Sequence, residues 1–259
     1  MKVIEDYNKV LSINELYEAI QGEGSRAGLP TIVIRTLGCQ LRCFFGEEGG
    51  FCDSWRNSWK LEKGIYTFND IIKMYDDRPD ITEMMLTGGG PSMHPALINS
   101  LCNFCHERGI IMTIETEGSQ EIHTDKPIHL VSISPKFSNT TPIVGLKTEW
   151  GREVTQNEVD KHEKNRTNPI AIQQLINSHL DFQIKPVVNP LSQPEIWNEV
   201  LDFIKLHNIP KDKIWIMPPG DSRDKLIKTY PDVINFCVEN GYNFTGRPHI
   251  MAFDTRRLV

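Results

Sequence analysis

The sequence contains no apolar run that approaches the ~18 residues needed for a membrane-spanning helix. Its opening stretch, MKVIEDYNKVLSINELYEAI, has acids at Glu5 and Asp6 and no apolar segment, which argues against a secretory signal peptide. We therefore expect a cytoplasmic protein, without a membrane partner, whose thiols stay reduced. Internal repeats and low-complexity segments are absent as well.

Positive charge is not in excess. The 28 lysines and arginines are outnumbered by 34 aspartates and glutamates, which gives a formal net charge of -6. This balance argues against a broad basic surface for nucleic acid, but it allows a small anionic substrate held by a few arginines. Hydrophobic residues make up 39% of the 259 residues, which is ordinary for a globular protein that needs no covalent crosslinks.

Short β-rich runs alternate with helical patterns along the chain. We expect strands at 31–36, 82–87, 110–116, 129–135, 182–188, 213–217 and roughly 243–250. We expect helices at 68–76, 95–108, 169–178, 194–207 and 222–239. Strands that alternate with helices predict βα units and a mostly parallel sheet, hence an α/β fold in a single domain over residues 1–259.

Residues 145–169 interrupt this alternation. The segment is polar, carries charges of both signs and has no clear apolar face before Pro169. We interpret it as a surface insertion, because long polar loops are more often solvated than functional, and we keep a lid over a site as the alternative.

Unusual residues follow four of the expected strands. Strand 31–36 leads into LGCQLRC, strand 82–87 into TGGGP, strand 110–116 into ETEGS, and strand 129–135 into SPK. Because the carboxyl ends of parallel strands meet at one edge of a sheet, we expect these groups to form one shared site.

Three cysteines, Cys39, Cys43 and Cys52, lie in the first of these loops, within fourteen positions. A structural zinc site usually has four ligands, and a disulfide framework needs an even number of cysteines. A four-iron cluster normally takes four thiolates, so three leave one iron open to an amine and a carboxylate, such as those of S-adenosylmethionine. Such a cofactor would carry the chemistry, and the protein would supply its placement.

The flanking residues agree with a cluster loop. The glycines Gly38, Gly46, Gly49 and Gly50 allow close approach of the backbone, and Phe51 can lie against an adenine ring. Zinc with a distant fourth ligand such as His94 remains an alternative. An electron-transfer cluster is another, although it needs a fourth cysteine nearby.

The other three cysteines have a simpler interpretation. Cys102 and Cys105 form a Cys-x-x-Cys motif, but they fall inside a strong helical pattern. We interpret both as buried helix residues, and Cys237 in VINFCVENG as a core residue, because cysteine is often simply buried.

Together these motifs resemble the radical S-adenosylmethionine superfamily, and within it the 7-carboxy-7-deazaguanine synthases. The superfamily spacing is Cys-x3-Cys-x-aromatic-Cys, and here the second interval is stretched to the eight residues FFGEEGGF. The stretch EAIQGEGSRAGLPTIVIRTLGC resembles the family's amino-terminal signature. CDS, ETEGS, SISPK and RPHIMAFDTRRLV resemble its Cys-Asp-Thr, Glu-Thr-Asn-Gly, Ser-Pro-Lys and closing segments. The resemblance implies a partial (β/α) TIM-type barrel of the radical S-adenosylmethionine class.

The resemblance also implies roles for individual residues. The residues implied to bind the substrate are Gln21, Glu23, Gly24, Arg35, Gly89 and His249. The residues implied to bind S-adenosylmethionine are Phe51, Gly88, Gly89, Glu115, Ser134 and Lys136. Cys39, Cys43 and Cys52 would hold a [4Fe-4S] cluster, and Ser54 would bind Mg²⁺.

The implied reaction converts 6-carboxy-5,6,7,8-tetrahydropterin into 7-carboxy-7-deazaguanine and ammonia, through a radical formed from the cofactor. The implied partners are the pterin, a reductant such as flavodoxin or ferredoxin, and a second copy of the chain in a homodimer. Another radical enzyme, such as a glycyl-radical activase, is one alternative function. A non-catalytic zinc or iron–sulfur module is the other.

Several of these residues also have ordinary structural interpretations. Arg35 ends an apolar strand and needs an anionic partner, which is either a substrate carboxylate or an acid such as Asp53. Ser54 suits a turn or a helix cap, and Lys136 suits solvent. His249, in an expected terminal strand, suits the core.

One motif departs from the superfamily. Its Gly-Gly-Glu is TGGGP here, with Gly90 at the glutamate position. The carboxylate contact to the cofactor is therefore lost at this position, and Glu115 and Glu117 are the candidates to replace it.

Overall fold

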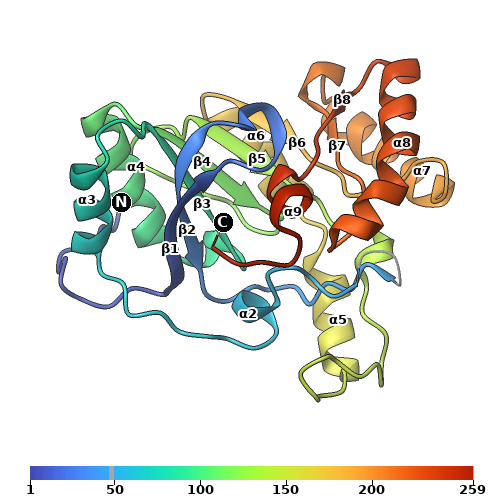
Figure 1. Ribbon diagram of the computed structural model, residues 1–259, viewed down its shortest axis with the longest axis horizontal. Coiled ribbons are helices and arrows are strands. Elements are labelled where there is room, and N and C mark those ends of the chain that lie inside the picture. Colours follow the sequence, from blue (N-terminus) through green and yellow to red (C-terminus); the bar gives the residue numbers. More distant parts are fainter. Residues whose placement is uncertain (47–49, 259) are drawn as a thin grey trace.

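A six-stranded sheet forms the centre of the molecule, in the order β1-β2-β3-β4-β5-β6 (Figure 1). The computed structural model describes residues 1–46 and 50–258. The strands are β1 (Ile13–Ile20), β2 (Pro30–Thr36), β3 (Glu83–Gly88), β4 (Ile111–Thr116), β5 (Leu130–Ile133) and β6 (Phe182–Ile184). β1 pairs antiparallel with β2, and each following pair is parallel. The expected mostly parallel α/β architecture is confirmed.

A small parallel pair, β7 (Trp215–Ile216) and β8 (Asn243–Phe244), extends this sheet. Single bridges from Ile184 to Ile214 and from Val187 to Met217 connect it to β6 and to the segment after β6. Within residues 1–46 and 50–258, β8 forms no ladder with β1, so the barrel is open between these strands.

Helices cover the sheet on its outer side (Figure 1). The larger ones are α3 (Phe68–Asp77), α4 (Pro95–Arg108), α6 (Pro169–Ser178), α7 (Pro194–His207) and α8 (Arg223–Asn240). α5 (Gln156–Asn165) is as long as α3, whereas α2 (Trp55–Ser58) and α9 (Pro248–Phe253) are shorter. There are 3-10 turns at Gly24–Arg26, Pro91–Met93, Ser138–Thr140 and Lys211–Lys213. None of the helices in the described ranges is long and apolar enough to cross a membrane.

The core lies between the sheet and these helices. The central strands are apolar almost continuously, as strands covered by helices are, and Ile34, Leu86 and Ile114 have no exposed surface. Cys102 and Cys105 on α4, and Cys237 on α8, are buried in this core. The interpretation of these cysteines as structural residues is confirmed.

The sequence-based prediction of a strand over roughly 243–250 is wrong at its end. β8 stops at Phe244, and α9 begins at Pro248. Proline is favoured in the first turn of a helix, where its missing N–H is not needed. His249 therefore lies on a short helix rather than in an apolar strand.

Besides the short helices α2 and α9, two elements were not expected from the sequence. β1 contains Glu15 and Glu18, residues with low β propensity, and as an edge strand it exposes part of its second half. α5 lies inside the polar insertion and starts with a capping box between Thr155 and Glu158. Of its residues only His162 is buried, which explains why no apolar face was visible in the sequence.

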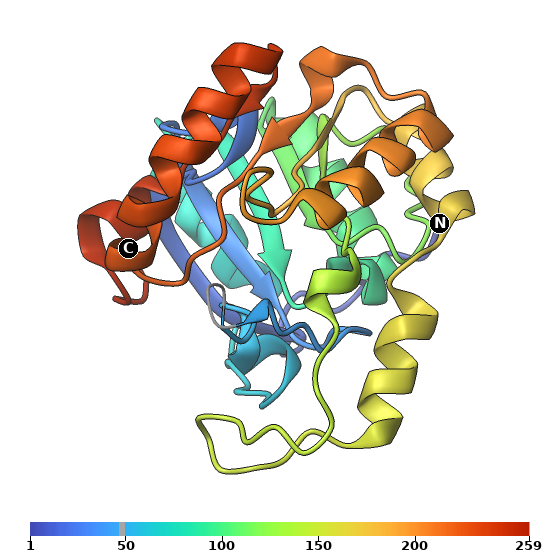
Figure 2. The same ribbon diagram turned by 90° about the vertical axis from the view of Figure 1, so that its right-hand side faces the viewer.

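The insertion packs against the cysteine loop. Its Trp150 stacks on Trp55 of α2, with ring centroids 4.6 Å apart and an interplanar angle of 12°. Figure 2 shows this yellow-green segment beyond the end of the sheet, next to α2. The insertion is thus partly an ordered cover and not only a solvated loop.

Candidate active site

One cavity lies at the carboxyl ends of the parallel strands and collects most of the residues predicted from the sequence. Its lining includes all three clustered cysteines and, among the predicted ligand-binding residues, Gln21, Glu23, Arg35, Phe51, Ser54, Gly88, Gly89, Glu115, Ser134, Lys136 and His249. The four strand ends that carried unusual motifs therefore meet at one site, as the parallel topology predicts. Gly24 does not line the cavity.

Gly24 has a structural role next to the site. Its φ is +73°, and a Cβ there would lie 2.1 Å from the side-chain nitrogen of Gln183. Its N–H donates a hydrogen bond to Thr245 Oγ1 over 2.6 Å. The glycine therefore lets the loop after β1 contact β6 and the segment after β8.

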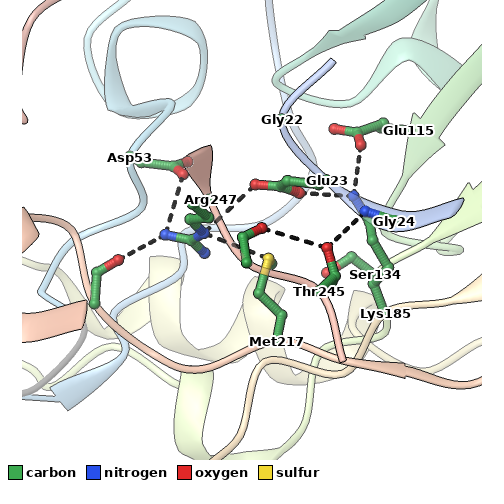
Figure 3. A network of polar contacts seen from close by, with 12 residues as sticks. Gly22, Glu23, Gly24, Asp53, Glu115, Ser134, Lys185, Met217, Thr245 and Arg247 are labelled. Atoms are coloured by element: carbon green, nitrogen blue, oxygen red, sulfur yellow. Dashed lines mark hydrogen bonds and ion pairs between the residues drawn. The ribbon is translucent and has the colours of Figure 1, made fainter. Parts of the chain in front are cut away.

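Glu23 sits at the centre of a buried charge network (Figure 3). Its Oε2 accepts a hydrogen bond from Lys185 Nζ at 2.6 Å, and its Oε1 lies 3.4 Å from Arg247 Nε. Lys185 also donates to Glu115 Oε1 at 2.5 Å. Burial by itself raises the pKa of Glu23, but the charges of Lys185 and Arg247 outweigh it and hold that pKa well below its ordinary value.

Lys185 and Arg247 were not among the residues predicted from the sequence. Lys185 is only 1% exposed, and Arg247 also donates to the Gly220 carbonyl oxygen at 2.7 Å. A lysine inside the apolar run FQIKPVV was the available signal for the first, because an unpaired charge there is costly. Arg247 is the first residue of RPHIMAFDTRRLV, which resembles the family's closing segment, but its partners lie far away in the sequence and no local pattern indicates them.

Arg35 projects from β2 toward the loop after the last cysteine. Its Nη1 donates to Ser54 Oγ at 2.9 Å, and its Nε lies 3.2 Å from Glu15 Oε2. The cross-strand pairing of β1 with β2 places Glu15 opposite Arg35. The acid paired with Arg35 is therefore Glu15, whereas Asp53 accepts from Ser54 Oγ at 3.2 Å.

His249 lies directly against the loop after β1. A Cβ at Gly22 would be 2.0 Å from His249 Nδ1, so the glycine makes room for the imidazole. Burial lowers the pKa of His249. The neutral ring can both donate and accept a hydrogen bond in the cavity.

The three clustered cysteines are free thiols that share the cavity. Burial raises the pKa of each, and it raises that of Cys52 to about 11. In the described part of the chain, no three His, Cys, Asp or Glu side chains are close enough to hold one metal ion. A cluster does not require this, because each thiolate binds a different iron.

A mononuclear zinc site fits these residues less well than a cluster does. His94, the candidate fourth ligand, has its Nε2 2.6 Å from the Leu37 carbonyl oxygen. It also does not line the cavity of the cysteines. His94 thus does not join the three thiols of the cysteine loop, and three thiols suit an iron–sulfur cluster with one open position.

The cysteine loop is held by aromatic residues. Phe51 lies 4.9 Å from Phe44 and 5.3 Å from Trp150 between ring centroids. Gly38, Gly46 and Gly50 have positive φ angles, as a tightly turning loop requires. Gly49 lies outside the described residues.

Close backbone approach shapes the cavity wall beside the cysteine loop. A Cβ at Gly88 would lie 2.3 Å from the Thr36 nitrogen, and one at Gly89 would lie 2.1 Å from the Gly38 oxygen. Lys136 Nζ donates to the Ser134 carbonyl oxygen at 2.6 Å and to its Oγ at 2.7 Å. Lys136 is therefore directed along the cavity wall and not into solvent.

Comparison with known proteins identifies the family. The 7-carboxy-7-deazaguanine synthase of Halobacterium salinarum is 32% identical over 247 residues, which cover 94% of this chain and 91% of that protein. The chain belongs to the 7-carboxy-7-deazaguanine synthase family. The synthase of Rhodopirellula baltica is 31% identical over 248 residues, 95% of this chain and 88% of its own. No general model of a protein family matches the sequence.

A solved structure supports the fold. The crystal structure of QueE from Escherichia coli is similar with a TM-score of 0.54 and 21% sequence identity, covering 90% of this chain and 92% of that chain. The open, mostly parallel sheet is thus the fold that this chain shares with that structure.

Proposed function

We propose that the protein is a carbon–nitrogen lyase that converts 6-carboxy-5,6,7,8-tetrahydropterin into 7-carboxy-7-deazaguanine and ammonia, a precursor step for deazapurines such as queuosine. The change is redox-neutral, since the product is the substrate less one molecule of ammonia. The observation that carries the proposal is the convergence of the three cysteines, Glu23 and Arg35 on one cavity.

The cysteine side of the cavity would hold the cofactors. Cys39, Cys43 and Cys52 would bind a [4Fe-4S] cluster. Phe51, Gly88, Gly89, Ser134 and Lys136 line the space beside it and would bind S-adenosylmethionine. Together these cofactors supply, when bound, the radical that removes a hydrogen atom from the substrate.

The opposite side would recognise the pterin. Glu23 is kept ionised by Lys185 and Arg247, so it can accept hydrogen bonds from two N–H groups of the pterin edge. Gln21 is buried nearby, and its amide offers both a donor and an acceptor. Neutral His249 also lines the cavity, where its ring can donate and accept a hydrogen bond.

Arg35 suits the carboxylate of the substrate, because a guanidinium binds a carboxylate with two parallel hydrogen bonds. Ser54 beside it would provide one oxygen ligand to Mg²⁺, which usually keeps further positions for water and substrate. Arg35 already donates to Ser54, and Arg247 lies 3.8 Å from Asp53. With two cations so close, the metal would bind only together with the anionic substrate.

Two further expectations concern partners and location. A reductant such as flavodoxin or ferredoxin would supply electrons, and two copies would form a homodimer. A reducing cytoplasm would keep the six thiols free.

Glu23→Gln tests the substrate assignment. The variant removes the negative charge but keeps the shape of the side chain. Deazaguanine formation should fall by at least about a hundred-fold, the effect expected when one or two hydrogen bonds to a charged group are lost. Cofactor cleavage to 5′-deoxyadenosine without product should survive, measured by mass spectrometry under anaerobic conditions. Glu107→Gln, an exposed glutamate on α4, is the control.

The same experiment separates the alternative functions. A glycyl-radical activase acts on a protein and would not need Glu23 to contact a pterin. Undiminished turnover of the pterin by Glu23→Gln would therefore contradict the proposed pocket. A protein that is colourless and contains zinc after anaerobic preparation would instead be a zinc module.

A further inference from the structure

Two departures from the family pattern face each other in this structure. Gly90 occupies the position of the glutamate in Gly-Gly-Glu, and Glu117 occupies the position of the asparagine in Glu-Thr-Asn-Gly. They follow the neighbouring parallel strands β3 and β4. A Cβ at Gly90 would lie 3.1 Å from Glu117 Oε1 and 3.4 Å from its Oε2.

The backbone at position 90 does not require glycine. Gly90 has φ -133° and ψ 94°, an extended conformation that any residue adopts. Gly88 and Gly89 differ, since a Cβ at either would collide with backbone atoms closer than 3.0 Å. At Gly90 the nearest atoms are the two oxygens of Glu117, followed by the Cys39 Cα at 3.6 Å. The missing side chain therefore makes room for one group, the Glu117 carboxylate.

The Glu117 carboxylate has one oxygen available to a ligand. Glu117 is 7% exposed, and its Oε1 accepts a hydrogen bond from Ser119 Oγ at 2.6 Å. Its Oε2 is buried without a hydrogen-bond partner among the described residues. A buried carboxylate oxygen without a donor is costly, and Glu117 lines the cavity of the cysteines. A donor that enters this cavity would satisfy it.

Glu115, the other candidate to replace the missing carboxylate, already accepts hydrogen bonds from the protein. Its Oε1 accepts from Lys185 at 2.5 Å, and its Oε2 accepts from Thr87 Oγ1 at 3.2 Å. Both oxygens thus have protein donors. Glu115 belongs to the network around Glu23, whereas Glu117 lies next to the first cysteine.

We propose that Glu117 binds the amino group of S-adenosylmethionine, in place of the carboxylate missing at position 90. The carboxylate reaches the same part of the cavity from the end of β4 instead of β3. Ser119 is a positioning residue that fixes the orientation of Glu117. This inference rests on the proposed function, because it requires that the protein bind S-adenosylmethionine.

The test is a binding measurement on anaerobically reconstituted holoenzyme, without the pterin. Glu117→Gln should bind S-adenosylmethionine about ten- to a hundred-fold more weakly than wild type, as for a lost charge-assisted hydrogen bond. It should bind 5′-methylthioadenosine, which lacks the methionyl amino group, with unchanged affinity. Glu121→Gln, an exposed glutamate of the same segment, should bind both as wild type does.

A reciprocal exchange makes the test specific. Glu117→Asn and Gly90→Glu should each weaken binding, the first by removing the carboxylate and the second by crowding it with another. The double variant G90E/E117N should recover wild-type affinity to within about a few-fold, since one carboxylate again faces the cavity. A merely structural role of Glu117 would not produce this recovery.

The outcomes separate a failure of the proposed function from a failure of the role proposed for Glu117. Wild type that binds no S-adenosylmethionine contradicts the proposed function itself. Wild type and Glu117→Gln that bind it equally contradict only the role of Glu117. Equal weakening for S-adenosylmethionine and 5′-methylthioadenosine, or a double variant without recovery, also overturns that role. If Glu117→Gln does not load its cluster, the double variant G90E/E117N replaces it as the test. Recovery of wild-type affinity for S-adenosylmethionine then supports the role of Glu117, and no recovery contradicts it.

Discussion

Lys185 Nζ lies 2.6 Å from Glu23 Oε2 and joins two loops that are far apart in the sequence. The lysine comes from the segment after β6, and the glutamate from the loop after β1. Lys185 makes a second ion pair with Glu115, near the carboxyl end of β4. One buried ammonium thus holds the substrate side of the cavity to the centre of the sheet.

Replacing this lysine should be strongly destabilising. Lys185→Met removes the cation from Glu115 and leaves Glu23 with Arg247 alone, and both carboxylates have little exposed surface. The free energy of unfolding should fall by about 3–5 kcal/mol, the usual effect of breaking a buried ion pair. Guanidinium denaturation of the cluster-free protein measures it.

The control for this variant is Lys213→Met. Lys213 pairs with Asp181 in a more exposed ion pair, where the effect should be roughly 0–1 kcal/mol. Equal effects of the two variants would show that the Lys185 pairs contribute no more than a surface contact.

His162 predicts a pH dependence of stability. It is fully buried on α5, accepts a hydrogen bond from the Arg42 backbone N–H and contacts Thr140 Oγ1. Burial, reinforced by the nearby cations Arg166, Lys136 and Arg42, lowers its pKa from 6.5 to about 4.

The folded state therefore favours neutral His162, and this contribution to stability is complete above the unfolded pKa of 6.5. It should decrease as the pH falls from 6.5 towards 4, by up to about 3 kcal/mol. Chemical denaturation across this range should show a shallower decline in His162→Asn than in wild type. His123→Asn, at an exposed histidine, should follow wild type. Parallel curves for wild type and His162→Asn would contradict the assignment.

Trp150 should protect the cluster loop. Its ring stacks on Trp55 and contacts Phe51, the residue before Cys52. Trp150→Ala should shorten the lifetime of the cluster in air several-fold, because the aromatic cover excludes water and oxygen. The decay of the visible absorbance of reconstituted protein measures this.

Trp197→Ala provides the comparison for Trp150. Trp197 packs on Phe236 and Tyr242, and it does not line the cavity of the cysteines. Its replacement should leave the decay rate of the cluster unchanged. A cluster equally stable in Trp150→Ala and wild type would mean that the insertion has no protective function.

Ser54 tests the magnesium proposal. Ser54→Ala should raise the KM for the substrate and weaken the activation by Mg²⁺ by about ten-fold, since one oxygen ligand is lost. Binding of S-adenosylmethionine should not change. An unchanged Mg²⁺ dependence would contradict the role of Ser54 as a ligand.

The convergence of the local motifs on one site could be predicted from the sequence, because parallel strands bring their carboxyl ends together whatever their order in the sheet. Cys39, Gly88, Glu115 and Ser134 lie at or just after the carboxyl ends of four different strands, and all line one cavity. Their convergence needed no knowledge of side-chain contacts.

The charge network could not be predicted in this way. Whether Lys185 is paired depends on Glu23, which lies 162 positions away, and no local pattern indicates this partner. Pro248 likewise starts a helix where apolar neighbours suggested a strand. The sequence offered both Glu115 and Glu117 as replacements for the carboxylate missing at Gly90. The structure distinguishes them, because both oxygens of Glu115 already accept hydrogen bonds from the protein.

The most direct measurement is an anaerobic assay of the reconstituted wild-type protein. It would contain S-adenosylmethionine, a reductant, Mg²⁺ and 6-carboxytetrahydropterin, with detection by mass spectrometry. We predict that 7-carboxy-7-deazaguanine forms, at the mass of the substrate less ammonia. Formation of 5′-deoxyadenosine without any deazaguanine, from protein with a fully loaded cluster, would contradict it.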